Sequence, residues 1–409
     1  MPLNTYRISC LFVAAALSTS TSLMAQAPAT PPPPAAPAAA DQPAAAPAAP
    51  AAPTWSVGPM DISGYIDAYY SFNANRPTNY ANGQVNDLYN FNDKTDQFNL
   101  SGAKLTINHD PDPVGAHVDF LYGRSNTIIN NAATNGSSSD QLNYIEQAFL
   151  SLKPTKAKGF ELDLGKFSTS AGAEVIEAKD DWSYSRGLLF AWAIPYFHFG
   201  ARASLPVSKT ETIGVQVVNG WNNVSKANGG ATVGFTSAFV KPKYTWNVNY
   251  YVGPENANTA SGFRNLIDTT LLLTPNSKFN AYINYDYGHQ QDATHTIDTG
   301  DGTITTGDNN ASTWQGVAVA LHEMTKGKSS FTERYEYFDD SDGFSTGTAQ
   351  HVQEVTGTYE YKWLEGLLTR VEYRGDFSNV EFFHKDDTQM VKNQQTVTVA
   401  FIAFFGPKR

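Results

Sequence analysis

The sequence predicts an all-β fold: a transmembrane, antiparallel, up-and-down β-barrel of about 16 strands, with short periplasmic turns and long extracellular loops. Three observations point to it. Strand-length segments of alternating apolar and polar residues follow one another along most of the 409 residues. The connections between these segments switch between short and long. Charged residues make up 16% of the chain and aromatic residues 13%, whereas ordinary soluble domains carry roughly 25% charged residues.

The final strand, residues 393–405, shows the alternation clearly. Side chains of a β-strand point alternately to its two faces. One face of this segment is apolar from end to end and consists of Val397, Val399, Phe401, Ala403 and Phe405. A barrel in a lipid bilayer needs such a face, because one side of its wall meets lipid and the other meets water. A soluble β-sandwich also alternates, but it explains neither the rhythm of the connections nor the aromatic last strand.

The predicted strands are separated by connections of two kinds. In chain order the strands are 60–72, 97–109, 115–125, 141–153, 160–168, 196–205, 211–221, 232–241, 243–252, 263–274, 278–288, 312–323, 329–339, 350–362, 367–379 and 393–405. Tight turns are expected at 110–113, 206–209, 241–243, 275–277 and 363–366, and long polar loops at 73–96, 126–140, 169–195, 289–311, 340–349 and 380–392. An even strand count places both ends of the barrel domain on the periplasmic side. The strands at 97–109 and 141–153 alternate less cleanly, which a bulge would explain.

The N-terminal region predicts export. Arg7 precedes an apolar run from Ile8 to about Ala16 and small residues up to Ala25, which is the pattern of a secretory signal peptide. No later run of about 18 apolar residues occurs, so no transmembrane helix is expected. We therefore expect a signal peptide at 1–25, an Ala/Pro-rich periplasmic linker at 26–58 and an outer-membrane barrel at 59–409 in a Gram-negative bacterium.

Two late strands carry charges of both signs on one face. The residues are Arg334, Glu336, Arg370, Glu372, Arg374 and Asp376. Charged side chains are costly on the lipid face, so we expect this face to line the lumen. Rows of mixed sign would create a transverse field and a polar path for small solutes. Alternatively, these side chains form salt bridges that only hold adjacent strands together.

The third long loop, 169–195, differs from the others because it ends in an apolar stretch at 188–195. So many apolar residues would be out of place in solvent, whereas a loop folded against the inner barrel wall would bury them. We hypothesise that it narrows the lumen, with constriction candidates Glu174, Glu177, Asp180, Asp181 and Arg186. An outer lid or an oligomer contact is the alternative.

Signals for catalysis or ligand chemistry are thin. The eight histidines show no His-Glu-x-x-His spacing and no Gly-x-Ser-x-Gly elbow occurs. The acidic stretch 339–343 fails as a calcium loop, since aligning Gly343 with the sixth position puts Phe338 first. The only cysteine, Cys10, lies inside the signal peptide. The prediction is therefore no enzyme, no catalytic residues, no cofactor and no metal, and the net charge of −11 argues against nucleic acid as a partner.

Several segments resemble the OmpL-like outer-membrane β-barrel porin family. They are 164–167, 172–176, 182–186, 198–202, 334–340 with Gly343, and 370–376, and the resemblance extends over most of the chain after about residue 60. It implies a porin-like barrel but brings no established substrate. In sixteen-stranded general porins the third loop folds inward, which agrees with the hypothesis for 169–195. The C-terminal tail 406–409 departs from the many barrels that end on an aromatic residue, so Phe405 would serve as that signal here.

Taken together, these features predict an outer-membrane porin that forms a passive diffusion channel for small hydrophilic solutes or ions. The alternative is a plugged structural or adhesive barrel without an open pore. The expected partners are outer-membrane lipid, the solutes themselves and the outer-membrane assembly machinery, with a homotrimer suggested by analogy to general porins.

Overall fold

The computed structural model describes residues 56–57, 59–78, 84–131, 142–226, 229–256, 260–291, 294–298, 303–307, 310–325, 327–386 and 388–406. The predicted signal peptide and almost all of the predicted linker lie outside these residues. Sixteen strands form the barrel wall: β2 (Met60–Asn73), β3 (Gln97–His109), β4 (Val114–Tyr122), β5 (Ile145–Leu152), β6 (Glu161–Ser168), β7 (Phe197–Pro206), β8 (Glu211–Val218), β9 (Thr232–Lys241), β10 (Tyr244–Pro254), β11 (Phe263–Leu273), β12 (Phe279–Gln290), β15 (Ser312–Met324), β16 (Ser329–Asp340), β17 (Gln350–Leu364), β18 (Leu367–Ser378) and β21 (Asn393–Phe405).

The sheet closes on itself. Each of these strands pairs antiparallel with its neighbour in the chain, and β2 pairs with β21, with Tyr65 opposite Phe404 and Asn73 opposite Thr396. Closure leaves no unpaired edge, as a wall surrounded by lipid requires. The predicted fold class and strand count are confirmed. A two-residue strand, β1 (Ser56–Val57), adds to the start of β2.

Burial follows the predicted alternation. In β21, Phe401 is 55% exposed on the outer surface, while its neighbours Ala400 and Ile402 are fully buried. The two strands that alternate less cleanly contain register shifts. Ser101 of β3 and Glu146 of β5 have no partner opposite them, because their neighbours pair with consecutive residues of the adjacent strand. Such bulges place one extra residue in the strand, and both extra side chains are buried.

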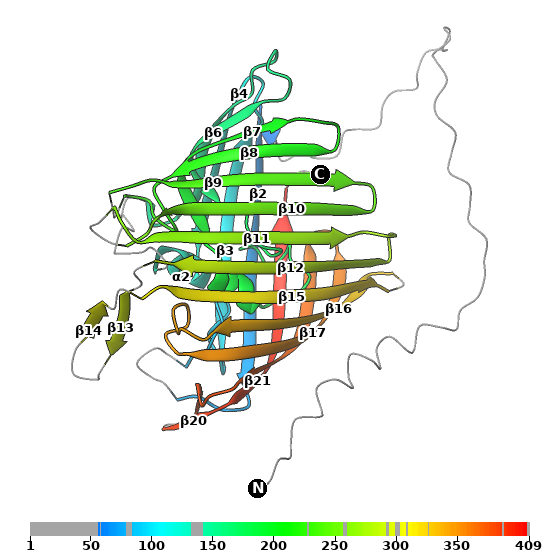
Figure 1. Ribbon diagram of the computed structural model, residues 1–409. Coiled ribbons are helices and arrows are strands. Elements are labelled where there is room, and N and C mark those ends of the chain that lie inside the picture. Colours follow the sequence, from blue (N-terminus) through cyan, green and yellow to red (C-terminus); the bar gives the residue numbers. More distant parts are fainter. Residues whose placement is uncertain are drawn as a thin grey trace. The chain divides into compact units, whose positions relative to one another are not determined.

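The two ends of the barrel differ, as Figure 1 shows. Tight turns join the strands at one end, on the right in this view. At the other end lie the long loops, which contain α2 (Arg124–Asn131) and the hairpins β13–β14 (Thr294–Asp298 and Thr303–Gly307) and β19–β20 (Phe383–Lys385 and Gln389–Val391). The connection from β6 to β7 contains the short π-helix η3 (Leu189–Ala193). None of these elements was predicted.

Several predicted strand ends are wrong. The segment 141–153 was expected to be extended throughout, but β5 begins at Ile145, and β8 ends at Val218 instead of at 221. The physical reason is clearest for β4. The segment 115–125 was expected to stay extended, but β4 ends at Tyr122 and α2 begins at Arg124. Gly123 lies between them with a φ of 105°, a backbone conformation that favours glycine. The change of direction at this glycine ends the strand. Among the described residues, no helix is long and apolar enough to cross a membrane.

Candidate functional site: the lumen and its inward loop

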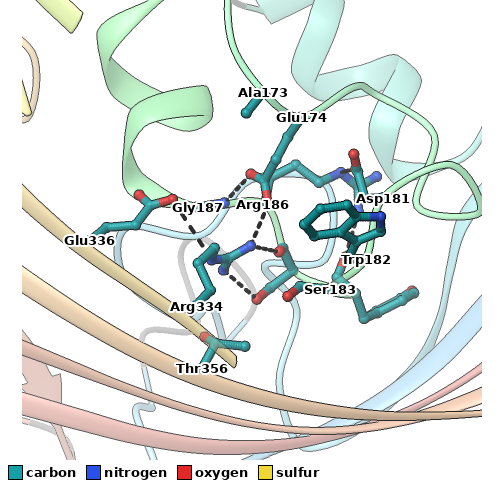
Figure 2. A network of polar contacts seen from close by, with 12 residues as sticks. Ala173, Glu174, Asp181, Trp182, Ser183, Arg186, Gly187, Arg334, Glu336 and Thr356 are labelled. Atoms are coloured by element: carbon teal, nitrogen blue, oxygen red, sulfur yellow. Dashed lines mark hydrogen bonds and ion pairs between the residues drawn. The ribbon is translucent and has the colours of Figure 1, made fainter. Parts of the chain in front are cut away.

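The segment 169–195, here called the inward loop, connects β6 to β7 and lies inside the barrel. Its side chains are buried although it is a loop: Tyr184 and Leu188 are 0% exposed and Arg186 is 1% exposed. The loop forms hydrogen bonds and ion pairs with inward-facing residues of strands on several sides of the wall. Figure 2 shows the central part of this arrangement, in which the loop meets the inner face of the wall.

The first part of the inward loop is held by polar side chains of β10, β11 and β12. The Ser170 hydroxyl lies 2.7 Å from the Tyr251 hydroxyl. The backbone N–H of Gly172 donates to Asp268 at 3.0 Å, and that of Ala173 donates to the Asn284 side chain at 3.2 Å. These bonds satisfy backbone groups that the loop would otherwise bury without partners.

Arg334 on β16 is the centre of the network in Figure 2. Its side chain is 0% exposed, and its Nε donates to Glu354 of β17 at 3.0 Å. One terminal nitrogen donates to the carboxylate of Glu174 and to the carbonyl of Ser185, the latter at 2.7 Å. Glu174 in turn accepts the backbone N–H of Gly187 at 2.6 Å. One arginine therefore joins the barrel wall to both arms of the inward loop.

Three alternate residues of β18 bind the same loop. Glu372 accepts the backbone N–H groups of Tyr184 at 2.5 Å and Ser185 at 2.9 Å. Arg370 donates to the Ser183 carbonyl at 2.9 Å, and Arg374 to the Arg186 carbonyl at 2.7 Å. The two arginines also pair with wall carboxylates, Arg370 with Glu360 and Arg374 with Asp376, each at 2.8 Å. Their period-two spacing explains why all three reach the lumen.

The apolar end of the inward loop forms η3 and packs inside the barrel, as its composition predicted. Its residues Leu189 and Phe190 belong to the main hydrophobic cluster together with Phe91 and Trp314. Polar bonds fix its position: the Leu189 N–H donates to Glu336 at 2.9 Å, and the Trp314 indole donates to the Ala193 carbonyl at 3.0 Å.

A second contact between the inward loop and the barrel wall lies at β3, far in sequence from β16 and β18. Lys104 forms ion pairs with Asp119 at 2.8 Å, with Glu146 at 3.1 Å and with Glu177 of the inward loop. The carboxylates of Asp119, Glu146 and Glu177 lie within 4.8 Å of one another, a spacing that could hold a cation. The Lys104 ammonium already fills that role, because it contacts all three.

All of the predicted constriction residues lie in or beside this network. They are Glu174, Glu177, Asp180, Asp181, Arg186, Arg334, Glu336, Arg370, Glu372, Arg374 and Asp376. Asp180 differs from the rest: its side chain is 53% exposed and pairs with Lys179. Most of the others join loop to wall, but the Asp376 side chain pairs within the wall, with Arg374, and the Asp181 and Arg186 side chains bond within the loop. Their role in lining a solute path stays a prediction. Asp181 accepts the Val175 N–H at 2.9 Å, and burial together with the nearby Glu174 charge raises its pKa well above the usual range.

Sequence reasoning missed several members of the network. Glu354 and Glu360 stand on the inward face of β17, which the same alternation test could have found. Lys104 and Glu146 were hidden because the bulges in β3 and β5 change which face a residue occupies.

Two cavities flank the inward loop along the lumen. The inner cavity, of about 220 Å³, lies toward the short turns and is bounded by Glu174, Asp180, Asp181 and Trp182 of the loop and by wall residues such as Tyr282. The outer cavity, of about 490 Å³, lies toward the long loops and is lined in part by Ala191 and Trp192 of η3. The charged residues that line the inner cavity are all acidic, and the one that lines the outer cavity is Arg264.

Comparison with known proteins matches residues 59–405 to the family described as "Putative beta-barrel porin-2, OmpL-like". The chain belongs to this family. A search of curated protein sequences returned no match. As the family implies, the protein is a passive channel of the outer membrane.

Solved structures of outer-membrane porins share the fold of this protein. OmpF of Salmonella typhi, in complex with daunomycin, aligns with a TM-score of 0.54 at 13% identity, over 85% of this chain and 97% of that one. The anion-selective porin of Comamonas acidovorans aligns with a TM-score of 0.52 at 10% identity, over 85% and 99%. A trimer form of OmpT from Vibrio cholerae aligns with a TM-score of 0.51 at 10% identity, also over 85% and 99%.

Proposed function

We propose that this porin admits small hydrophilic solutes and ions by passive diffusion, and that the inward loop sets the size limit and the charge bias of the path. The observation that supports this is the attachment of one loop to charged side chains of β3, β16 and β18, with a cavity on each side of it. A loop fixed in this way would narrow the barrel while leaving space on both of its sides. Sieving and lining charge then select the solutes.

The acidic lining of the inner cavity supports a preference for cations at that point. Three carboxyl groups border it, those of Glu174, Asp180 and Asp181. The Asp180 carboxylate is the one best placed to act on a passing ion, because it is 53% exposed although it pairs with Lys179. Glu174 is buried in its pair with Arg334, and burial raises the pKa of Asp181.

A plugged barrel remains the second candidate, and one observation favours it. Arg334, Arg370 and Arg374 are all engaged by loop carbonyls and wall carboxylates, so these inward charges serve as loop anchors. A barrel plugged by the inward loop would act through its outer loops. The proposal assigns no catalytic step, cofactor or metal to either form.

Export by a signal peptide at 1–25, tethering by the linker at 26–58 and insertion by the outer-membrane assembly machinery belong to the same proposal. So does a homotrimer, which rests on fold similarity to porins such as the OmpT trimer form.

Liposome swelling tests this function. Liposomes containing the refolded barrel are diluted into isosmotic solutions of neutral sugars of increasing size. The proposal predicts rapid swelling with the smallest sugars and a sharp fall as sugar size grows. Liposomes without protein give the baseline. If the folded barrel gives only that baseline for every sugar, the plugged form is correct.

A further inference from the structure

The outer cavity has a chemical character of its own. It opens among the long loops, and its volume of about 490 Å³ lies within the range of roughly 300–1,000 Å³ found for small-molecule sites. Its lining includes five aromatic residues and one charged residue: Trp192, Tyr196, Trp221, Trp314, Phe344 and Arg264. An aromatic enclosure around a single arginine differs from the acidic inner cavity.

The aromatic rings hold the Arg264 guanidinium in place. Its central carbon lies 4.8 Å from the ring centroid of Trp221, 5.1 Å from that of Phe344 and 6.0 Å from that of Trp314. Trp314 and Phe344 are themselves stacked at 4.9 Å with an interplanar angle of 14°. Arginine packs on aromatic faces in this way while keeping its N–H groups available at the edge.

The hydrogen-bonding edge of Arg264 is only partly used. Its Nε donates to the Gln290 side chain at 2.8 Å, but neither terminal nitrogen donates to any other described residue. Arg264 lines the cavity, so this edge can meet a ligand there. A guanidinium binds a carboxylate through two parallel N–H···O bonds when both nitrogens are available on one side.

The carboxylate of Glu255, which interacts with Arg264, leaves the guanidinium able to bind a ligand carboxylate. Glu255 interacts electrostatically with Arg264, but its carboxylate accepts the Trp221 backbone N–H at 3.1 Å and the Thr232 hydroxyl at 2.5 Å. It does not line the cavity, and no acidic side chain does. A ligand in the cavity therefore meets positive charge and ring faces.

We propose that the outer cavity is a binding subsite for small aromatic carboxylates, whose carboxylate pairs with Arg264 and whose ring packs against the aromatic side chains of the cavity wall, Phe344 among them. Stacking on ring faces favours a planar apolar body, and the single cationic group favours one carboxylate. Asn90, Asn222 and Ser345 also line the cavity, but Asn90 donates to the Ala191 carbonyl and Asn222 accepts the Tyr196 N–H. These two amides are therefore already engaged by the protein, which disfavours a sugar as the ligand. The subsite deepens the proposed function, because it names a solute class that the channel would collect at its outer mouth.

Binding of benzoate to the full-length barrel in detergent tests the subsite. Three tryptophans line the cavity, so quenching of tryptophan fluorescence reports occupancy, with calorimetry as a second readout. Benzyl alcohol, which keeps the ring without the charge, and cyclohexanecarboxylate, which keeps the charge without the aromatic ring, are the matched probes. We expect saturable benzoate binding that is at least tenfold tighter than binding of either probe.

Arg264→Met should weaken benzoate binding at least tenfold. The matched control is Arg202→Met, because Arg202 also lies over two aromatic rings, those of Phe149 and Phe167, but its Nε is paired with Asp163 at 2.7 Å. It should leave binding unchanged. Phe344→Ala is the second test variant, since Phe344 lies in the loop between β16 and β17 and its truncation leaves the wall intact. It should also weaken binding about tenfold.

The subsite is wrong if benzoate binds no more tightly than benzyl alcohol, or if either test variant binds benzoate like the unmodified protein. Tighter binding of a neutral sugar such as glucose would overturn the ligand class. A conductance measurement distinguishes failure of the subsite proposal from failure of the proposed channel function. A silent barrel that binds benzoate keeps the subsite and refutes the pore, whereas a conducting barrel without benzoate binding does the reverse.

Discussion

Arg334→Met should release the inward loop. The methionine keeps an unbranched apolar side chain of similar length but removes the guanidinium. Arg334 is 0% exposed and pairs with Glu174 and Glu354, and it also donates to the Ser185 carbonyl. Its loss leaves two buried carboxylates without their cation, and breaking a buried pair in this way costs about 3–5 kcal/mol. Because each 1.4 kcal/mol is a factor of ten, loop opening should rise by roughly two to three and a half powers of ten.

Hydrogen exchange in detergent measures that opening directly, read over the backbone amides of 174–187. Exchange there should speed up by the stated factor, while amides of β9 and β10 keep their protection. Single-channel recordings should show larger or more frequently fluctuating currents. The control is Lys153→Met, since Lys153 pairs with Glu161 near the short turns and the two side chains are 45% and 30% exposed. An exposed pair contributes about 0–1 kcal/mol. Unchanged loop exchange in Arg334→Met would refute the anchoring role of Arg334.

Four further predictions address other parts of the site. Trp182→Ala removes the ring that stacks on His322 at 5.0 Å and borders the inner cavity, so single-channel conductance should rise; an unchanged current would place the narrowest point elsewhere. Gly187→Ala should disturb the loop and speed exchange of its amides, because a Cβ there would overlap the Glu336 carboxylate. Since burial raises the pKa of Asp181, the folded loop holds a proton that an unfolded chain releases, and loop stability should fall as pH rises through that raised pKa; Asp181→Asn should flatten this pH dependence in exchange measurements at pH 5 and pH 8. Light scattering of the detergent complex should give three chains per particle, and a single chain would exclude the trimer.

The regular part of the fold could be read from the sequence because the bilayer imposes a simple rule. Phe401 must face lipid and Ala400 must not, so period-two alternation identifies strands and their faces in a single sequence. The elements that were missed follow no such rule. Helix α2 begins after a single glycine, Gly123, whose turn depends on backbone conformation, and the β13–β14 hairpin lies in a stretch whose sequence is mostly polar.

The candidate site was predictable to the extent that it depends on composition and alternation. Apolar residues at 188–195 indicated a buried loop, and β18 alternation placed Arg370, Glu372 and Arg374 inside. The ion-pair partners of these residues could not be predicted from the sequence, because they depend on strand register and on the path of the loop. Arg334 meets Glu174 across 160 residues of sequence, and Lys104 meets Glu146 only through a bulge. Arg264 gave no signal at all, since its setting is created by rings that are far apart in the sequence, Trp221 and Phe344 in loops and Trp314 in β15.

Single-channel conductance of the refolded barrel in planar bilayers, with reversal potential in a KCl gradient, tests the central claim most directly. A passive channel narrowed by the inward loop predicts a steady conductance that increases when the loop is loosened by Arg334→Met. The acidic inner cavity predicts a reversal potential of the sign expected for cation preference. A barrel whose folding is verified by circular dichroism but which passes no current, with or without Arg334, would contradict the claim.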